Sequence, residues 1–393
     1  MFQELQAAPA DAILSLIVEY KNDPRPEKID LGVGVFKTAL GETPVLEAVK
    51  EAEKRLLKSQ SSKAYIGSAG AQDFNVAMSE LTYGNTLDSD RLASLQTPGG
   101  SGSLRVAAGL IQRCGGSNRV WVGEPTWANH IPLLGGAGLE LKMHAYYDSN
   151  THKLREADML EALSKAPKGD MVLLHACCHN PSGIDPTEEQ WRAIADVIVE
   201  RDLVPFIDMA YQGFGSDLDT DAFMIRHLAE RVEEMIVCNS CSKNFGLYRD
   251  RVGALSFLTP NAKTRDIVQS QANNVVRTMY SMPPDHGAAV VSIILHDDAL
   301  RAQWVKEVEE MRERIFDMRT LLVDTLRDKA PDHDFSHLAV AKGMFCFLGI
   351  TAEQVEQLKK EHGVYMVNSS RINVAGITAG NVEYLASSIA SVL

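Results

Sequence analysis

The segment Leu203-Val204-Pro205-Phe206-Ile207-Asp208 is an apolar run that ends in a carboxylate, as expected for a buried strand whose carboxyl end faces a ligand. Residues 171–175 form a second apolar run, which opens into a turn made by Asn, Pro and Gly. Outward from these two segments, helical stretches alternate with short apolar strands from about residue 46 to about residue 295. This alternation predicts an α/β fold with a mostly parallel sheet.

The rest of the chain predicts a second, smaller domain, because 393 residues are too many for one simple core. Residues 303–326 predict one long amphipathic helix, and residues 344–348 and 371–374 predict strands. The helix carries an apolar stripe that we expect to pack in the core or between domains. The residues of the stripe are Trp304, Val308, Met311, Ile315, Met318 and Leu322.

A lysine between two serines and an arginine is the strongest chemical signal. Lys243 lies in Ser240-Cys241-Ser242-Lys243-Asn244-Phe245-Gly246, eight residues ahead of Arg251. A lysine that condenses with an aldehyde needs neighbours that lower its pKa, and an arginine with serine hydroxyls suits a phosphate. Pyridoxal 5′-phosphate is an aldehyde that carries a phosphate, and its ring accepts electrons from amino-acid carbanions. The alternative is a surface lysine in a loop, the commonest fate of a lysine.

Residues upstream supply the other contacts that this cofactor needs. Asp208 is a suitable partner for a protonated pyridine nitrogen. Its alternative role as a helix N-cap is weakened because residues 209–215 predict a loop. Tyr211 would follow in that loop into the same site. Asn180, in the turn after residue 175, can donate from its amide to a ring phenolate.

A glycine-rich segment predicts an anion site. Thr97-Pro98-Gly99-Gly100-Ser101-Gly102-Ser103 precedes a helical pattern over residues 104–111. Glycines expose backbone N–H groups, and a helix start adds the positive end of its dipole. The segment is neither a Walker loop nor a dinucleotide fingerprint. The earlier Gly32-Val33-Gly34-Val35 also fails the dinucleotide pattern and lies on no evident strand-to-helix turn.

Nearly from end to end, the chain resembles the fold-type I, class I aminotransferases of the aspartate/aromatic subgroup. The matching segments are LGVGV (31–35), GETPVL (41–46), YIG (65–67), TPGG (97–100), PTWANH (125–130), CCHNPSG (177–183), AYQGF (210–214), SKNFGLY (242–248), YSMPPDHG (280–287) and SRINVAG (370–376). The resemblance implies a large domain with a mostly parallel seven-stranded sheet flanked by helices, plus a smaller α/β domain. It implies an N-terminal arm and part of the small domain over residues 1–43, the large domain over 44–310 and the small C-terminal domain over 311–393.

The resemblance also implies roles in binding pyridoxal phosphate. Lys243 would form the Schiff base and then carry the proton between the substrate α-carbon and the cofactor. Asp208 would pair with the ring nitrogen, Tyr211 and Asn180 would bind the ring 3′-oxygen, and Trp127 would stack on the ring. The phosphate would be held by Gly100, Ser101, Ser240, Arg251 and Tyr65 of the partner subunit.

For the substrate, the resemblance implies a homodimer with shared active sites. Arg371 is similar to the residue that binds the α-carboxylate, and Arg277 to one that reaches across the dimer to a side-chain carboxylate. Gly34, Trp127 and Asn180 would also contact the substrate. An arginine is more often a solvated surface charge, but bidentate recognition of a carboxylate is what its planar fork does best.

The implied activity is transfer of an amino group from aspartate or aromatic amino acids to 2-oxoglutarate by a ping-pong reaction. Where aspartate-specific relatives carry Asn, Asn, Thr and Tyr, this chain has smaller or more apolar residues, namely Ala64, Met282, Ser101 and Phe36. A less polar pocket accepts an aromatic side chain at lower desolvation cost. We therefore expect dual aspartate and aromatic specificity, with a strictly aspartate-specific enzyme as the alternative.

Two further alternatives use the same cofactor. A lyase or synthase of this fold type need not keep an arginine for a second carboxylate, so Arg277 favours transamination. A pyridoxal-binding regulator would need an attached DNA-binding domain, and residues 1–30 are too short and too acidic for one. The net charge of −13 argues against nucleic-acid partners. No signal peptide or run of 18 apolar residues is evident, so we expect a soluble, cytoplasmic protein with no membrane partner.

The six cysteines predict neither a disulfide framework nor a metal site. His175, Cys177, Cys178 and His179 invite a metal interpretation. We expect none, because adjacent residues on extended backbone point to opposite faces and no second ligand pair has zinc-finger spacing. Cys238 and Cys241 form a C-x-x-C pattern without a thioredoxin-like context, so redox function is not expected there.

Overall fold

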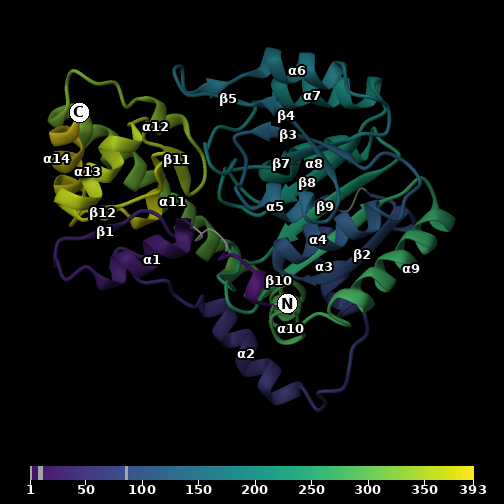
Figure 1. The fold of residues 1–393 in the computed structure, drawn as a ribbon. Coiled ribbons are helices and arrows are strands. Elements are labelled where there is room, and N and C mark those ends of the chain that lie inside the picture. Colours follow the sequence, from purple (N-terminus) through teal and green to yellow (C-terminus); the bar gives the residue numbers. More distant parts are fainter. Residues whose placement is uncertain (1, 8–11, 85–86) are drawn as a thin grey trace.

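The computed structural model describes residues 2–7, 12–84 and 87–393, and these form a larger lobe and a smaller lobe that holds the C-terminus (Figure 1). Within these residues, the larger lobe is built on a seven-stranded sheet of order β2-β10-β9-β8-β7-β3-β4. Only β10 runs antiparallel to its neighbours, so the predicted α/β fold with a mostly parallel sheet is confirmed. The strands are β2 (Leu92–Pro98), β3 (Arg119–Glu124), β4 (Glu140–Ala145), β7 (Met171–His175), β8 (Val204–Met209), β9 (Met235–Ser240) and β10 (Val252–Leu258).

Alternate side chains of the central strands enter two different apolar layers. Leu173 and Phe206 belong to one layer, and Val172 and Ile207 belong to the other. The first layer is completed by α4 (Gly99–Ile111), α5 (His130–Gly135) and α9 (Ala262–Met279). The second is completed by α2 (Glu47–Ser59), α3 (Gln72–Tyr83), α6 (Glu156–Ser164), α7 (Glu188–Glu200), α8 (Phe223–Ala229) and α10 (His286–His296). Both faces of the central strands are buried, which explains why β7 and β8 are near-continuous apolar runs.

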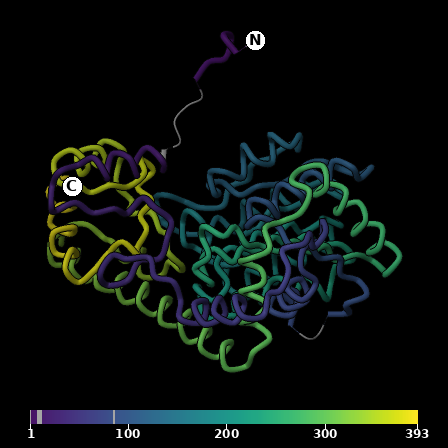
Figure 2. The backbone as a smooth tube through the Cα atoms, turned by 90° about the horizontal axis from the view of Figure 1, so that it is seen from below, coloured from purple at the N-terminus to yellow at the C-terminus, as the bar shows by residue number. Residues whose placement is uncertain are grey.

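The smaller lobe brings together segments from both ends of the chain (Figure 1). β1 (Ile29–Asp30) pairs in parallel with β12 (Val364–Tyr365), and β11 (Phe345–Phe347) pairs antiparallel with β13 (Arg371–Asn373). The surrounding helices are α1 (Ala12–Asn22), α12 (His337–Val340), α13 (Ala352–His362) and α14 (Val382–Val392). The remaining elements are the hairpin β5 (Tyr147–Asp148) with β6 (Lys153–Leu154), and the short helices η1 (Phe2–Glu4), η2 (Ser89–Arg91), η3 (Thr220–Ala222) and η4 (Val374–Gly376). Of these, η1 stands apart from the rest of the chain (Figure 2).

The long helix α11 (Asp298–Lys329) joins the two lobes and confirms the helix predicted over residues 303–326. It begins earlier than predicted because the Asp297 carboxylate accepts a hydrogen bond from the Leu300 N–H and so caps the helix. The predicted apolar stripe is buried or partly buried. The expected domain boundary after residue 310 falls inside this helix. No helix of the described residues is both long and apolar enough to cross a membrane.

The N-terminus of α2 is capped by a side chain from α11. The residue before α2, Leu46, has no side-chain oxygen, and the carboxylate of Glu307 accepts the N–H groups of Glu47 (2.6 Å) and Ala48 (3.1 Å) instead. We expect Glu307→Ala to lower the free energy of unfolding by about 1 kcal/mol, the usual cost of losing a cap. Urea denaturation would measure it, with Glu310→Ala on the exposed face of α11 as the control. Equal midpoints for the two variants would contradict this assignment.

Candidate active site

A cleft of about 260 Å³ opens at the carboxyl ends of β7 and β8 and is lined by residues of both lobes. This position agrees with the rule that ligands bind at the carboxyl ends of parallel strands. The predicted site residues that line it are Gly34, Gly100, Ser101, Trp127, Asn180, Asp208, Tyr211, Ser240, Lys243, Arg251 and Arg371. Two predicted residues, Tyr65 and Arg277, do not line it.

Asp208 is held as a carboxylate by an imidazole. The Nε2 of His130 lies 2.9 Å from the Asp208 Oδ2, and both side chains are buried. Burial alone would raise the pKa of Asp208. The hydrogen bond from His130, together with the electrostatic influence of His130, His175 and Lys243, outweighs burial and lowers that pKa below its usual value. Asp208 is therefore ionised at neutral pH and can hold a proton on a ring nitrogen.

His130 continues into a hydrogen-bonded chain. Because the Asp208 carboxylate can only accept, His130 Nε2 donates to it, and His130 Nδ1 accepts from the Thr126 hydroxyl (2.8 Å). The Thr126 oxygen in turn accepts from His175 Nε2 (3.1 Å). Burial, together with the electrostatic influence of the neighbouring His130, lowers the pKa of His175 to about 3, so His175 is neutral. His175 then accepts the Asn180 N–H at Nδ1 (3.4 Å).

Sequence reasoning assigned no role to His130, Thr126 or His175 around the carboxylate. A signal for His175 was present, since it ends β7 as Asp208 nears the end of β8. The parallel register places these two residues opposite each other. Tyr248 was also missed. It ends the SKNFGLY match, lines the cleft and accepts the Phe36 N–H at its hydroxyl (2.9 Å).

Lys243 lies in the loop after β9 and points over the ring of Tyr211, with Nζ 4.7 Å from the ring centroid. Burial lowers the pKa of Lys243 to about 8. The Asp208 carboxylate opposes this shift and the Arg251 guanidinium adds to it. An appreciable share of the amine is therefore unprotonated near neutral pH. This is the condition that a nucleophilic lysine requires.

The glycine-rich segment differs from the prediction, because the helix begins at Gly99 rather than at Leu104. Gly99 has a φ of +74°, and a Cβ at this position would collide with the guanidinium of Arg251. A side chain is therefore excluded, and the strand can turn directly into the helix. The first N–H groups of α4 have no partner within the helix. They lie beside Ser240 and Arg251, as a phosphate site requires.

Arg371 is arranged to accept a ligand. Its Nη2 donates to the Gly32 carbonyl (2.8 Å), and its guanidinium carbon lies 4.3 Å from the centroid of the Phe345 ring. Its buried Nε and the buried Oδ1 of Asn180 have no hydrogen-bond partner among the residues that the structure describes. Unpaired buried polar atoms are costly, so both indicate a bound polar group. Arg371 and Asn180 lie in the same cleft as the ionised Asp208, the Lys243 amine of lowered pKa and the anion site on α4. Together these groups fit a phosphorylated pyridine aldehyde.

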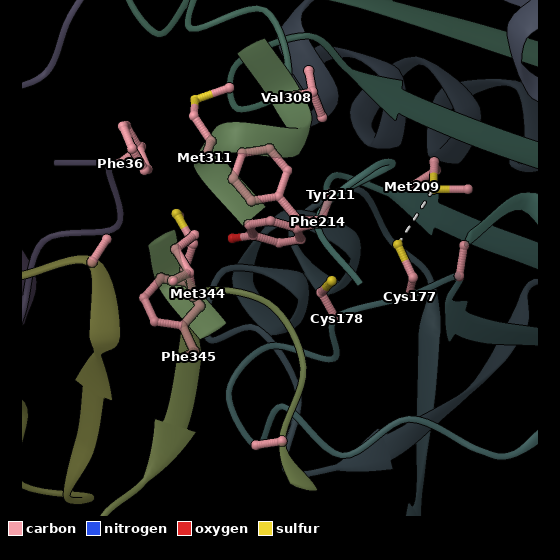
Figure 3. Close-up of a cluster of buried hydrophobic side chains, with 14 of the residues drawn as sticks. Phe36, Cys177, Cys178, Met209, Tyr211, Phe214, Val308, Met311, Met344 and Phe345 are labelled. Carbon is pink, nitrogen blue, oxygen red and sulfur yellow. Dashed lines mark hydrogen bonds between the residues drawn. The ribbon is translucent and has the colours of Figure 1, made fainter. Parts of the chain in front are cut away.

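Tyr65 and Arg277 are exposed and do not line the cleft of their own chain. The Tyr65 side chain is 93% exposed, and Arg277 is an exposed residue of α9 that donates to the Ser281 hydroxyl. Of the residues expected to set specificity, only Ser101 lines the cleft, since Ala64 is exposed, Met282 is partly buried and Phe36 is buried in the core. Figure 3 shows Phe36 in a cluster of buried hydrophobic side chains that also contains Met311. A single chain therefore does not contain the complete predicted site.

The argument against a metal at Cys177 and Cys178 was wrong in its geometry. Cys178 has a φ of +52° rather than an extended backbone, and both thiols lie within 4.8 Å of each other and of a carboxylate oxygen of Asp221. The hydrogen bond with Cys178 and burial raise the pKa of Cys177, and burial raises the pKa of Cys178 to about 11. Cys177 Sγ also contacts Met209 Sδ at 3.8 Å (Figure 3). That this cluster holds no metal stays a prediction, now based on protonated thiols.

Cys238 and Cys241 do not form a paired motif. Both are free and buried, but Cys238 belongs to one apolar layer and Cys241 to the other. Cys241 Sγ lies 3.8 Å from Met78 Sδ. The two thiols therefore lie in the apolar layers on opposite faces of the sheet.

Comparisons with known proteins extend over the whole chain. A family model described as aminotransferase class I and II matches residues 26–389. The chain is 46% identical to aspartate aminotransferase of Escherichia coli strain K12, with full coverage of both. It is 44% identical to aromatic-amino-acid aminotransferase of Pseudomonas aeruginosa, covering 100% of this chain and 98% of that one. The solved structure of aromatic-amino-acid aminotransferase from Burkholderia pseudomallei, covalently bound to pyridoxal phosphate, matches with a TM-score of 0.97 at 39% identity, covering 100% and 99%.

Proposed function

Because the chain belongs to the class I and II aminotransferases, we propose that it transfers the amino group of both aspartate and aromatic amino acids to 2-oxoglutarate. It is an aminotransferase that uses pyridoxal 5′-phosphate. The observation that carries the proposal is one cleft that contains three groups. They are Lys243, an amine of lowered pKa, the ionised Asp208, and Arg371, whose Nε has no partner among the described residues. Full-length similarity to both aspartate and aromatic aminotransferases supports the dual specificity.

We propose the following division of labour within the cleft. Bound pyridoxal phosphate supplies the electron sink for a carbanion at the substrate α-carbon. Asp208 would keep the ring nitrogen protonated, Asn180 and Tyr211 would hydrogen-bond the ring 3′-oxygen, and Trp127 would pack on the ring. Residues at the start of α4 and beside it would hold the phosphate, namely Gly100, Ser101, Ser240 and Arg251.

Lys243 and Arg371 would handle the substrate. Unprotonated Lys243 would remove the α-proton and return it on the cofactor side, since its pKa of about 8 lets the amine alternate between its two forms near neutral pH. Arg371 would bind the α-carboxylate with the edge of its guanidinium that carries the unpaired Nε. Gly34 lies beside it in the cleft wall. A Cβ at Gly34 would be 2.9 Å from the Phe345 ring, so a larger residue there would force this ring to move.

We further propose a homodimer in which each chain completes its partner's site. Tyr65 of the partner subunit would reach the phosphate, and Arg277 of the partner subunit would bind the substrate's side-chain carboxylate. Support comes from the exposure of both residues and from their absence from the cleft of their own chain. We also propose that residues 44–310 form the larger domain, and that residues 1–43 and 311–393 form the smaller one. Closed two-fold symmetry would then give two equivalent sites.

A strictly aspartate-specific enzyme is the second candidate, favoured by the 46% identity to an aspartate aminotransferase. The kcat/KM values for aspartate, phenylalanine and tyrosine, each with 2-oxoglutarate, decide between the two. Dual specificity predicts aromatic values within about 100-fold of the aspartate value, which corresponds to transition-state free energies within about 2.7 kcal/mol of each other. A larger gap in favour of aspartate would support the second candidate.

Arg277→Ala should cut kcat/KM for aspartate by at least about 100-fold, since removing the partner of a desolvated charge is strongly unfavourable. Phenylalanine has no second carboxylate, so its kcat/KM should change far less or rise. The control is Lys263→Ala, which removes an exposed charge at the other end of α9. Equal losses for aspartate and phenylalanine would show that Arg277 does not recognise the substrate's second carboxylate.

Mixing Arg277→Ala chains with Lys243→Ala chains tests the sharing of sites. If Arg277 acts across the dimer, a hybrid dimer has one site that combines an intact Lys243 with an intact Arg277. Aspartate turnover should then return to about half the wild-type value per hybrid dimer, because one of two equivalent sites is complete. Absence of rescue in hybrids whose formation has been confirmed would contradict the cross-subunit role.

A further inference from the structure

The loop that carries Lys243 is held by hydrogen bonds to residues that do not line the cleft. Asn244, the next residue, accepts the indole N–H of Trp304 at its backbone carbonyl (2.7 Å). Its side-chain Nδ2 donates to the backbone carbonyl of Gln212 (3.2 Å). Trp304 is fully buried, and Asn244 and Gln212 are almost so. None of these three residues lines the cleft.

Trp304 of α11 contacts two consecutive residues of the loop that carries Lys243, Asn244 and Phe245. Besides its hydrogen bond to Asn244, its ring stacks on the Phe245 ring at a centroid separation of 4.4 Å and an interplanar angle of 7°. A buried indole N–H without a partner is costly, so the hydrogen bond and the stacked ring together favour one position for the loop. Lys243 therefore projects from backbone that is held by a helix from another part of the fold.

Asn244 also links the loop that carries Lys243 to the loop that carries Tyr211, through a hydrogen bond to Gln212. Gln212 directly follows Tyr211, so the Asn244–Gln212 hydrogen bond joins the residue after the lysine to the residue after the tyrosine. The Gln212 side chain is anchored in turn, because its Nε2 donates to the carbonyls of Leu81 (3.0 Å) and Leu218 (2.9 Å). The contact that this arrangement controls is the 4.7 Å approach of Lys243 Nζ to the Tyr211 ring.

We propose that Trp304 and Asn244 are positioning residues that hold the Lys243 amine at a fixed place beside Tyr211 for proton transfer. The proposal rests on the proposed function of the same cleft. Its physical basis is that a displacement of about 1 Å at a reacting group can cost about 100-fold in rate. Because neither side chain touches the cleft, both act through Lys243.

The helix that carries Trp304 is also fastened to the smaller lobe, through which Arg371 enters the site. Arg314 of α11 donates to the carbonyls of Thr38 (2.9 Å) and Ile377 (3.0 Å). Buried Arg319 donates to the carbonyls of Leu338 and Gly343. The lysine loop and the α-carboxylate site thus share one support, α11. The contacts of Arg314 and Arg319 with the smaller lobe do not involve Trp304, so a change in Trp304 should affect Lys243 while leaving Arg371, and so substrate binding, largely intact.

The decisive variant is Trp304→Phe, which keeps a ring to stack on Phe245 and removes the N–H donor together with the second ring of the indole. With saturating pyridoxal phosphate, kcat for aspartate should fall by about 10- to 100-fold while KM stays within about threefold, since only orientation in the reacting complex is lost. The matched control is Trp121→Phe. It removes an indole hydrogen bond to Asp170 (2.8 Å) at a place outside the cleft, and both kinetic constants should stay near wild type.

The second readout is independent of turnover. In the cofactor-free full-length chain, the pH dependence of Lys243 acylation by a small reagent, followed by mass spectrometry, gives the pKa of the amine. Burial is the main cause of its low value, about 8. A loosened loop in Trp304→Phe should admit water and raise that pKa by about one unit, whereas Trp121→Phe should not change it. This measurement stays informative even if wild type proves inactive toward aspartate, which would refute the proposed function alone.

Asn244→Leu provides a second route if Trp304→Phe does not fold. Leucine is similar in size, and the Oδ1 that it removes has no partner in the described structure, so the main loss is the bond to Gln212. We expect the same fall in kcat at nearly constant KM and the same rise in the Lys243 pKa. The proposal is overturned if a folded Trp304→Phe or Asn244→Leu protein keeps both the wild-type kcat and the wild-type lysine pKa.

Discussion

Lys243→Ala should lower turnover with aspartate by more than about 10⁴-fold, because it removes both the nucleophile and the proton carrier from the cleft. The wild-type protein should be yellow from its bound cofactor. Borohydride reduction followed by mass spectrometry should place that cofactor on Lys243, and the variant should carry no such adduct. Stopped-flow measurement of the first half-reaction with aspartate gives the rate directly.

The control for this variant is Lys342→Ala. Lys342 is an exposed lysine that donates to the Ser216 hydroxyl (3.0 Å) and does not line the cleft. It should keep the wild-type rate and the wild-type colour. A Lys243→Ala protein with near-wild-type rates would overturn the assignment of the nucleophile, whatever its colour.

The second large effect is expected at Asp208. Asp208→Ala should slow removal of the α-proton by at least about 100-fold, since a preorganised charge is worth ~3 kcal/mol or more to the developing charge. Asp208→Glu should keep part of the activity, because it retains a carboxylate in a displaced position. Deuterium at the substrate α-carbon would identify the slowed step through its isotope effect. Similar rates for the Ala and Glu variants would contradict a role for the charge.

The pH dependence of Asp208 has a definite sign. Its pKa is lowered in the folded protein, so its ionised form stabilises the fold above the unfolded pKa, and that stabilisation is lost only as the pH falls through the folded pKa. Asp208 should therefore remain charged from pH 5 upward. A fall in the rate of Lys243 acylation in the cofactor-free chain, as the pH drops through about 8, belongs to Lys243 and not to Asp208.

Much of the site could be predicted from the sequence because its residues follow recognisable strands or stand in short motifs. Asp208 lies near the end of an apolar run, Asn180 lies in a turn of Asn, Pro and Gly, and Lys243 lies between serines and an arginine. A strand period of two and the turn preferences of Asn, Pro and Gly act over a few residues. Such signals need no knowledge of the rest of the fold.

The sequence by itself therefore determined the α/β class, the long helix after residue 300, and the set of residues that meet at the ends of β7 and β8. Only the tertiary structure decided how these residues are supported. The register of β7 against β8 places His175 opposite Asp208, and α11 brings Trp304 to the carbonyl of Asn244, 60 residues earlier in the chain. Folding also leaves Tyr65 and Arg277 exposed and outside their own cleft. The physical reason is that local propensity sets the elements, whereas contacts between distant segments depend on how the buried faces of those elements pack together.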